Sequence, residues 1–398
     1  MSEWLRLHFA ELVPFPALGD RLTDEQALQL AVQQAFEGYG FTAPNPAVGC
    51  VILDSKNQFI SMGYHHRAGE GHAEALALAG LREGQSLKGA RVFVTLEPCA
   101  HEGRTPSCAK ALAKTEVSEV LAVLRDPNPL VSGQGFEILK AAGKKVRCLE
   151  AEGSAHEPLI EAARAVCEFF LTNFADKRPF VSLKVATSLD GMMGLRNGQS
   201  QWLTSPASRD FARFLRGAHE ACLVGKQTVL KDNPRLDARD TRFAKESRHV
   251  VILDSKGELL TKPDLQLFKT HSAQNIWIAV GPESVHKASS LAQVLLVEEQ
   301  ISPAEYLKKT LKALWERQIR SIWIEGGAQT LSSALGAGIG DRLWLFQGPH
   351  LLGGRHGRSW TESWGSEHMA ERRTLGAVRH LALGPDHVTT GRMIISKT

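Results

Sequence analysis

The sequence predicts an α/β protein made of two alternating domains, and three observations indicate this. Helix-like and strand-like segments alternate along the chain, as is typical of layered α/β folds. The 398 residues are 43% hydrophobic and 23% charged, which is near the globular average and sufficient for two domains. A mixed-charge helical stretch that ends at Lys177-Arg178-Pro179 separates the two alternating runs.

The sequence therefore predicts that the chain divides into four segments. Residues 1–22 are predicted to form an irregular arm, because they contain prolines and end in a glycine turn. Residues 23–150 form the first domain, residues 151–178 a connecting segment, and residues 179–398 the second domain.

The first domain begins with a clear helix signal. Thr23 and Gln26 have the spacing of a capping box, and the helix that they open is expected to end at Gly38. The elements expected after it are an apolar strand at 48–53, a helix from His72, a strand at 91–96, a helix at Cys108, and strands at 119–124 and 145–149.

The second domain opens with a strand at 180–186, and further strands are predicted near 220–224, 248–254, 275–280 and 320–325. Ser302, Pro303 and Glu305 predict the start of a helix at 303–318. The strand at 320–325 runs into Gly326-Gly327 and a further helix. Backbone N–H groups at such a turn bind phosphate, but glycine turns of this kind also arise for steric reasons alone.

His72-Ala73-Glu74, together with Pro98-Cys99 and Cys108, predicts a zinc-dependent hydrolytic deaminase. Zinc binds imidazole nitrogen and thiolate sulfur, and three protein ligands leave one position for a water nucleophile. Zinc deaminases of nucleobases show H-x-E followed by P-C-x-x-C, in which the Glu is not a ligand but transfers protons. Here eight residues, instead of two, separate the cysteines.

Local signals place the zinc ligands on regular elements. Cys99 follows the strand at 91–96, and Thr105-Pro106 predicts a helix start. Cys108 would then lie in the first helical turn, where the helix dipole favours a thiolate. A structural zinc site with His101 as the fourth ligand is the alternative.

Composition limits the possible partners and compartment. The net charge of +4 is spread without long basic runs, so no nucleic-acid partner is expected. Six cysteines in a chain of this length do not indicate a disulfide framework, and a cytoplasmic location is predicted. The chain shows neither a signal-peptide pattern nor a long apolar segment, so no membrane partner is expected.

Several longer motifs occur across both domains. In the first domain they are Asn45-Pro46-Ala47-Val48-Gly49-Cys50-Val51, Gly69-Glu70-Gly71-His72-Ala73-Glu74, the segment from Thr95 to Cys108, and Asp126-Pro127-Asn128-Pro129. In the second domain they are Leu183-Lys184, Ser188-Leu189-Asp190-Gly191, the segment from Gly198 to Ser205, the segment from Thr228 to Pro234, Leu253-Asp254-Ser255, Glu325-Gly326-Gly327 and Leu351-Leu352-Gly353-Gly354. On these motifs the chain closely resembles the bifunctional riboflavin-biosynthesis deaminase/reductase family. The resemblance extends from about residue 28, and the eight-residue gap between the cysteines is characteristic of that family.

The resemblance implies a two-step enzyme. An N-terminal, cytidine-deaminase-like α/β/α domain would hydrolyse the 2-amino group of 2,5-diamino-6-(5-phosphoribosylamino)pyrimidin-4(3H)-one. A C-terminal, dihydrofolate-reductase-like domain would use NADPH to reduce the ribosyl side chain of 5-amino-6-(5-phosphoribosylamino)uracil to ribityl. The implied cofactors are Zn²⁺ and NADPH, and the implied assembly is a homodimer or homotetramer.

The resemblance also implies roles for individual residues. Zinc would be held by His72, Cys99 and Cys108, Glu74 would transfer protons, and Asn45 and Asn128 would contact the pyrimidine. The residues that match cofactor contacts are Ala186, Trp202, Thr228, Asp232, Ser255, Gly327, Ala328, Gln329, Thr330, Leu331, Ser332 and Ser333. The residues that match contacts of the reductase substrate are Lys184, Ser200, Arg216, Leu236, Arg239 and Glu325.

Elementary chemistry agrees with part of this assignment. The guanidinium groups of Arg216 and Arg239 are suited to a sugar phosphate, although either could also be a solvated surface charge. The side chain of Trp202 offers a flat face for a ring. Hydride transfer requires few ionisable groups, because the cofactor carries the chemistry.

Three other readings remain open at this level. The first domain could belong to a nucleic-acid or nucleoside zinc deaminase, although such enzymes usually keep the two-residue cysteine gap. The zinc could stabilise a non-catalytic binding protein, which would have no use for Glu74. The reductase domain could also have decayed, leaving a monofunctional deaminase.

Overall fold

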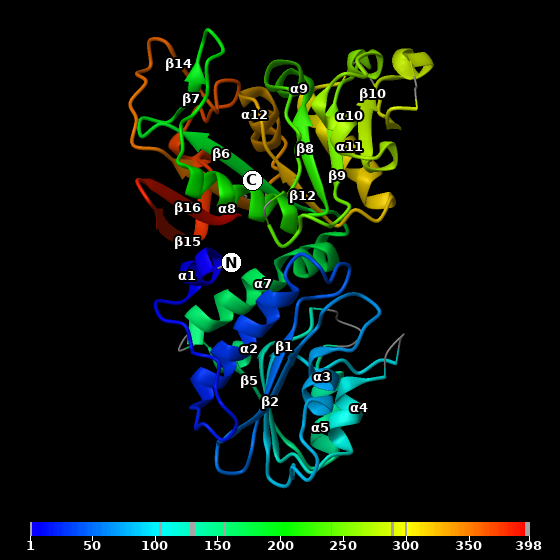
Figure 1. The fold of residues 1–398 in the computed structure, drawn as a ribbon, viewed down its shortest axis with the longest axis vertical. Coiled ribbons are helices and arrows are strands. Elements are labelled where there is room, and N and C mark those ends of the chain that lie inside the picture. Colours follow the sequence, from blue (N-terminus) through cyan, green and yellow to red (C-terminus); the bar gives the residue numbers. More distant parts are fainter. Residues whose placement is uncertain are drawn as a thin grey trace. The chain divides into compact units, whose positions relative to one another are not determined.

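The computed structural model describes residues 2–102, 106–127, 132–153, 156–239, 241–287, 290–298 and 301–394. The chain divides after Lys177 into two compact units, Met1–Lys177 and Arg178–Thr398, which are described separately below. Figure 1 shows both units and labels many of their elements.

The first unit is a sheet with helices on both faces. Its strands lie in the order β2-β1-β3-β4-β5, where β1 is antiparallel to β2 and β3, and β3, β4 and β5 are parallel. The helices are α1 (Ser2–His8), α2 (Asp24–Gly38), α3 (Ala73–Ala79), α4 (Cys108–Ala113), α5 (Gln134–Ala141), α6 (Leu149–Glu152) and α7 (Glu157–Asp176), and the strands are β1 (Gly49–Leu53), β2 (Phe59–Tyr64), β3 (Arg91–Leu96), β4 (Glu119–Leu124) and β5 (Lys145–Cys148).

Successive side chains of β4 pack into the hydrophobic cores on opposite faces of the sheet. Leu121 and Val123 belong to the core shared with α2 and α7, whereas Val120 and Ala122 belong to the core shared with α3, α4 and α5. Successive side chains of a strand point to opposite faces, so one apolar strand contributes to both cores. The predicted α/β/α layering of this domain is confirmed.

Two segments differ from their prediction. The arm at 1–22 was predicted to be irregular, but α1 occupies Ser2–His8 and buries Trp4, whose ring stacks on that of Phe36 with centroids 4.4 Å apart. The segment at 151–178 contains the predicted helix, α7, but it belongs to the first unit instead of connecting two domains, and it packs on α2 and β4. Both segments have apolar side chains to bury, and the first unit provides the surface for them.

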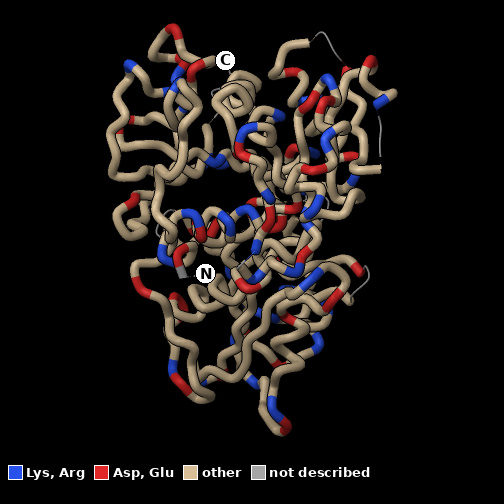
Figure 2. The backbone as a smooth tube through the Cα atoms, turned by 45° about the horizontal axis from the view of Figure 1, so that its top comes forward, with Lys and Arg blue, Asp and Glu red and all other residues tan. Residues whose placement is uncertain are grey.

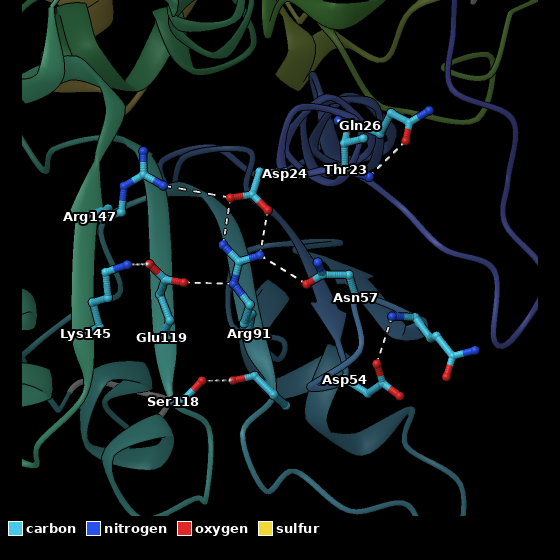
Figure 3. A network of polar contacts seen from close by, with 12 residues as sticks. Thr23, Asp24, Gln26, Asp54, Asn57, Arg91, Ser118, Glu119, Lys145 and Arg147 are labelled. Atoms are coloured by element: carbon cyan, nitrogen blue, oxygen red, sulfur yellow. Dashed lines mark hydrogen bonds and ion pairs between the residues drawn. The ribbon is translucent and has the colours of Figure 1, made fainter.

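A charged network crosses the sheet at the amino ends of its parallel strands (Figure 3). Arg91, Glu119 and Lys145 are register partners on β3, β4 and β5. The Arg91 guanidinium lies 2.8 Å from Glu119 Oε2, and 2.6 and 2.7 Å from the two carboxylate oxygens of Asp24. Because Asp24 is the first residue of α2, the network joins that helix to the sheet edge. Cys99 follows the opposite, carboxyl end of β3.

Two predicted helix starts can be compared with the structure. The capping box of Thr23 and Gln26 is present at α2, as predicted. Helix α4 begins at Cys108 with Ser107 as its N-cap, because the Ser107 hydroxyl accepts a hydrogen bond from the Lys110 N–H. The predicted start at Thr105-Pro106 was therefore slightly early, but Cys108 does lie in the first helical turn.

The second unit is a mixed sheet in the order β11-β10-β9-β8-β12-β6-β13-β16-β15. It is parallel from β11 to β13, and β16 and β15 continue it as an antiparallel hairpin. Its strands are β6 (Phe180–Thr187), β7 (Met192–Leu195), β8 (Ala221–Gly225), β9 (His249–Leu253), β10 (Ile276–Val280), β11 (Gln293–Leu296), β12 (Ser321–Ile324), β13 (Arg342–Gln347), β14 (Gly357–Ser359), β15 (Thr374–Leu383) and β16 (Asp386–Ile394), with β7 and β14 forming a separate pair.

The helices of the second unit are α8 (Pro206–Ala218), α9 (Lys226–Asp232), α10 (Gln266–Thr270), α11 (Pro303–Glu316) and α12 (Ala328–Gly336), with short 3₁₀ turns η2 (Glu258–Thr261), η3 (Ala273–Asn275), η4 (Pro282–Lys287) and η5 (Met369–Glu371). Ser302 caps α11, as predicted. In the described part of the chain, no helix combines the length and the apolar character that crossing a membrane requires.

Candidate functional site

Three side chains of the first unit form a metal-binding group. His72 is the N-cap of α3, Cys99 follows β3, and Cys108 begins α4. The Nδ1 atom of His72 lies 3.5 Å from Cys99 Sγ and 3.4 Å from Cys108 Sγ, and the three ligand atoms lie within 4.8 Å of one another. Tetrahedral zinc with bonds of about 2.0–2.3 Å separates neighbouring ligand atoms by roughly 3.5 Å, so the donors fit zinc.

The donor set is that of a catalytic site. In the residues that the structure describes, the group contains His72, Cys99 and Cys108 but not His101. Three protein ligands leave a zinc position for water, whereas structural sites usually have four. A hydrogen bond from Cys108 lowers the pKa of the Cys99 thiol to about 4, so this sulfur is available as the thiolate that zinc binds.

Glu74 lies on α3, two residues after His72, in the same cavity as the metal group. The cavity has a volume of about 560 Å³ and is lined by Asn45, His65, Glu97, His101 and Phe170, among others. Burial raises the pKa of the Glu74 carboxyl to about 7. A carboxyl group with a pKa near neutrality can both accept and release a proton.

Asn45 lies at this cavity and is oriented by a histidine that the sequence analysis did not single out. The Nδ2 atom of Asn45 lies 3.1 Å from His65 Nε2, and His65 Nδ1 lies 3.0 Å from the carbonyl oxygen of Gly71. With Nδ1 protonated, Nε2 accepts from the Asn45 amide, which leaves the amide oxygen for other contacts. Asn128 lies outside the described residues.

Glu97 is a second residue that the sequence analysis did not assign. Its buried carboxylate accepts hydrogen bonds from the backbone N–H groups of Asp126, Gly133, Gly135 and Phe136, at 3.0 to 3.4 Å. A side chain at Gly135 would place its Cβ 2.0 Å from the carbonyl oxygen of Pro98, so this approach requires glycine. The position of Glu97 beside Pro98-Cys99 was the one available signal.

The second unit has a cavity of about 510 Å³ lined by many of the residues matched to cofactor and substrate. Those at the cavity are Lys184, Ala186, Ser200, Trp202, Arg216, Thr228, Asp232, Leu236, Arg239, Glu325 and Gly327. They come from β6, the segment before α8, α8 itself, α9, the segment after α9 and the end of β12. The cavity therefore lies at the carboxyl ends of parallel strands, where α/β proteins bind ligands.

Glu325 is the buried acid of this cavity. Its Oε1 lies 2.8 Å from Arg216 Nη2, and Trp323 Nε1 donates to its Oε2 at 3.2 Å. Burial opposes its ionisation, but Arg216 and Lys184 hold the pKa of Glu325 below its ordinary value. Burial also lowers the pKa of Lys184. The cavity therefore combines a carboxylate with two cationic side chains.

Comparisons with known proteins assign both units. Residues 179–389 match the RibD C-terminal domain, and residues 21–124 match the cytidine and deoxycytidylate deaminase zinc-binding region. The riboflavin biosynthesis protein RibD of Aquifex aeolicus is 37% identical over 337 residues, which cover 84% of this chain and 89% of that protein. The chain belongs to the RibD family. It is thus a riboflavin-biosynthesis enzyme with a zinc-binding deaminase domain and a reductase domain of the kind that uses NADPH.

Other RibD proteins agree with this assignment. RibD of Escherichia coli is 33% identical, with 83% of this chain and 89% of that protein covered. Acinetobacter baumannii RibD has a TM-score of 0.77 at 34% identity, covering 93% of this chain and 99% of that one. A deaminase and 5-amino-6-(5-phosphoribosylamino)uracil reductase from Thermotoga maritima also has a TM-score of 0.77, at 31% identity and with the same coverage.

Some residues matched on the RibD motifs do not line the second cavity. Ser255 follows β9, and its carbonyl oxygen accepts from the Gly281 N–H at 2.8 Å. The turn at 327–333 becomes the first two turns of α12, where Leu331 packs in the core. Of this turn, only Gly327 is at the cavity; the residues away from it are Ala328, Gln329, Thr330, Leu331, Ser332 and Ser333.

Arg216 and Arg239, the two arginines matched to contacts of the reductase substrate, differ in how much of the guanidinium group is left to bind a ligand. Both Nη groups of Arg216 are used within the protein, one by Glu325 and the other by the carbonyl oxygen of Asp237 at 2.9 Å. Arg216 also lines the cavity, and its contact with the sugar phosphate stays a prediction. Arg239 pairs with the Asp237 carboxylate, and its side chain is 43% exposed, which leaves part of it for an anionic ligand.

Proposed function

We propose that the first unit hydrolyses the 2-amino group of 2,5-diamino-6-(5-phosphoribosylamino)pyrimidin-4(3H)-one, and that the second unit reduces the ribosyl side chain of 5-amino-6-(5-phosphoribosylamino)uracil to ribityl. The observation that carries the first step is the three-ligand group of His72, Cys99 and Cys108 beside the buried acid Glu74. The Thermotoga maritima relative, named for both activities, supports the pair of substrates.

In the deamination, His72, Cys99 and Cys108 would hold zinc, which supplies a Lewis acid that activates water. Glu74 accepts the proton of the attacking water and delivers it to the departing amino nitrogen, so that the ring gains oxygen and loses ammonia. The side-chain amide of Asn45, whose Nδ2 faces His65, presents its oxygen to the pyrimidine edge.

In the reduction, NADPH supplies the hydride. Opening of the ribosyl ring leaves an imine between its C1′ carbon and the amino nitrogen of the pyrimidine, and reduction of this imine gives the ribityl chain. Lys184 would supply the proton that the imine nitrogen receives, and the Glu325 carboxylate at the same cavity would orient the ribosyl chain. Trp202 is 65% exposed, and the Arg209 guanidinium lies 4.4 Å from its ring centroid, so its other face remains available to a planar ring.

The charge distribution favours this function over a nucleic-acid deaminase. The net charge is +4, and Figure 2 shows Lys and Arg positions interspersed with Asp and Glu positions along the chain. A nucleic-acid binder would gather its basic residues into a patch or stripe. The proposed partners are therefore small phosphoribosyl pyrimidines.

A cytoplasmic location and a homodimer or homotetramer complete the proposal. All six cysteines are free thiols, as expected of a reducing compartment. Light scattering coupled to size exclusion measures the assembly directly, and a monomeric mass would contradict this part of the proposal.

One coupled assay tests the proposed function. Zinc-loaded protein is given the diaminopyrimidine ribosyl phosphate, ammonia release is followed, and NADPH is then added while its absorbance is recorded. Ammonia release followed by NADPH oxidation supports both steps. Ammonia release without NADPH oxidation would indicate a decayed reductase, and the absence of both signals would overturn the proposed substrates.

A further inference from the structure

Behind the reductase cavity lies a buried group of side chains that does not itself reach the cavity but contacts the cavity's acid. Trp323 on β12 is fully buried, and Cys222 on β8 is 3% exposed. Neither lines the cavity, whereas Glu325, Lys184 and Arg216 do. Both residues form hydrogen bonds with the Glu325 carboxylate.

The Glu325 carboxylate is held on both of its oxygens. Trp323 Nε1 donates to Oε2 at 3.2 Å, while Arg216 Nη2, at 2.8 Å, and the Cys222 thiol, at 3.5 Å, both approach Oε1. Arg216 is an ion-pair partner and could hold one oxygen in several orientations of the carboxylate plane. The indole N–H on the other oxygen removes that freedom, because two fixed donors on two oxygens define the plane.

The geometry of β12 explains why Trp323 can do this. Residues two apart on a strand point to the same side, so the side chains of Trp323 and Glu325 lie together. The indole is itself held by packing, with its ring centroid 5.3 Å from that of His219. Burying an indole N–H without an acceptor costs free energy, and for Trp323 the acceptor is Glu325.

We propose that Trp323 is a positioning residue of the reductase, which orients the Glu325 carboxylate toward the substrate through its indole N–H. The inference rests on the proposed reduction, in which Glu325 contacts the ribosyl chain. Its effect is exerted through Glu325, since Trp323 itself does not touch the cavity.

The test compares two identical substitutions in the full-length protein. Trp323→Phe keeps an aromatic ring but removes the donor to Glu325. Trp344→Phe is the matched control, because Trp344 on β13 is also fully buried, and its Nε1 has no hydrogen-bond partner within the described segments. Deaminase activity of each variant reports whether the other unit is intact.

For Trp323→Phe we expect the reductase kcat to fall about tenfold, because a hydrogen bond to a charged group is lost. The KM for NADPH should stay unchanged. The acid limb of the pH profile should move to higher pH, since Glu325 loses a donor that favours its ionised form while Lys184 (β6), Arg216 (α8) and Cys222 (β8) still face it. Trp344→Phe should change none of these quantities. If both variants give the same rate and pH profile, the inference is wrong.

A spectroscopic measurement separates this inference from the proposed function. In protein labelled with ¹⁵N-tryptophan, Glu325→Gln should shift the indole resonance of Trp323 and leave that of Trp344 in place. An unmoved Trp323 resonance would overturn the inference whatever the activity. A shifted resonance in a protein whose wild type does not oxidise NADPH would instead refute the proposed reduction, and with it the role assigned to Glu325.

Discussion

Among single residues, Glu74 is the one that we propose to transfer protons in the deaminase site. It lies in the cavity of the zinc ligands, but it is not a member of the donor group formed by His72, Cys99 and Cys108. Proton transfer and metal binding should therefore be separable by one substitution.

Glu74→Gln is predicted to lower the deamination rate by about 10²–10⁴-fold, because the amide cannot accept a proton from water. Zinc content, measured by atomic emission, should remain equal to that of the wild type. NADPH-dependent reduction of the deaminated product provides an internal control. Unchanged deamination would favour a zinc-stabilised binding protein, and loss of zinc would place Glu74 among the ligands.

The buried imidazole of His219 makes the stability of the second unit depend on pH. Its Nδ1 lies 2.7 Å from the carbonyl oxygen of Leu215 and its Nε2 lies 2.9 Å from Ser182 Oγ, which suits the neutral imidazole. Burial lowers the pKa of His219 to about 3 from the ordinary value of 6.5. Between these values the unfolded chain binds a proton and the folded chain does not, so acid favours unfolding.

The stability that depends on neutral His219 is predicted to be complete above pH 6.5 and to be lost as the pH falls toward 3. His219→Gln should therefore reduce the stability difference between pH 7 and pH 5 by about 2 kcal/mol. Hydrogen exchange of α8 peptides in urea measures this in the intact chain, and peptides of the first unit serve as the control. An equal pH dependence in both proteins would contradict the assignment.

At the scale of elements, the charged network sets the register of the first unit's parallel strands. Arg91, Glu119 and Lys145 are register partners on three neighbouring strands, and Asp24 adds the start of α2 (Figure 3). A shift of one residue between these strands would separate the opposite charges.

Arg91→Met is predicted to destabilise the first unit by about 2–3 kcal/mol, because it leaves the buried Glu119 and the partly exposed Asp24 without their shared cation. Lys140→Met removes an exposed ion pair with Glu137, in which the side chains are 55% and 72% exposed, and should cost less than about 0.5 kcal/mol. Urea unfolding followed by loss of deaminase activity compares the two. Equal unfolding midpoints would show that the network contributes little.

At the scale of the whole molecule, the two activities belong to separate compact units. The zinc ligands and Glu74 all lie within Met1–Lys177, and every residue of the reductase cavity lies within Arg178–Thr398. A ligand that binds only the folded form of one unit stabilises that unit.

Zinc removal is accordingly predicted to lower the melting temperature of the first unit and to abolish deamination, with the reductase rate unchanged. Calorimetry of the full chain with and without a chelator should show one transition that moves and one that stays. Restoring zinc should restore the first transition. A parallel loss of reductase activity would show that the units depend on each other.

Sequence alone determined the features whose signals are local. The capping box at Thr23, the apolar strands and the motif of His72, Cys99 and Cys108 depend on residue types at short spacing, and the structure contains each of them. The layered fold and the family followed from the same motifs. Helix α1 and the packing of α7 were missed, because their stability comes from surfaces of the first unit and not from local propensity.

Only the tertiary structure decided which side chains hold the functional residues in place. Glu97 binds backbone N–H groups up to 39 positions away, and Arg216 uses its guanidinium on Glu325 instead of leaving it free. The proposed role of Trp323 likewise depends on a tertiary contact, because its indole N–H donates to that same carboxylate. Helical and strand periodicity in the sequence do not predict such contacts, because a hydrogen bond depends on distance and direction in the folded chain.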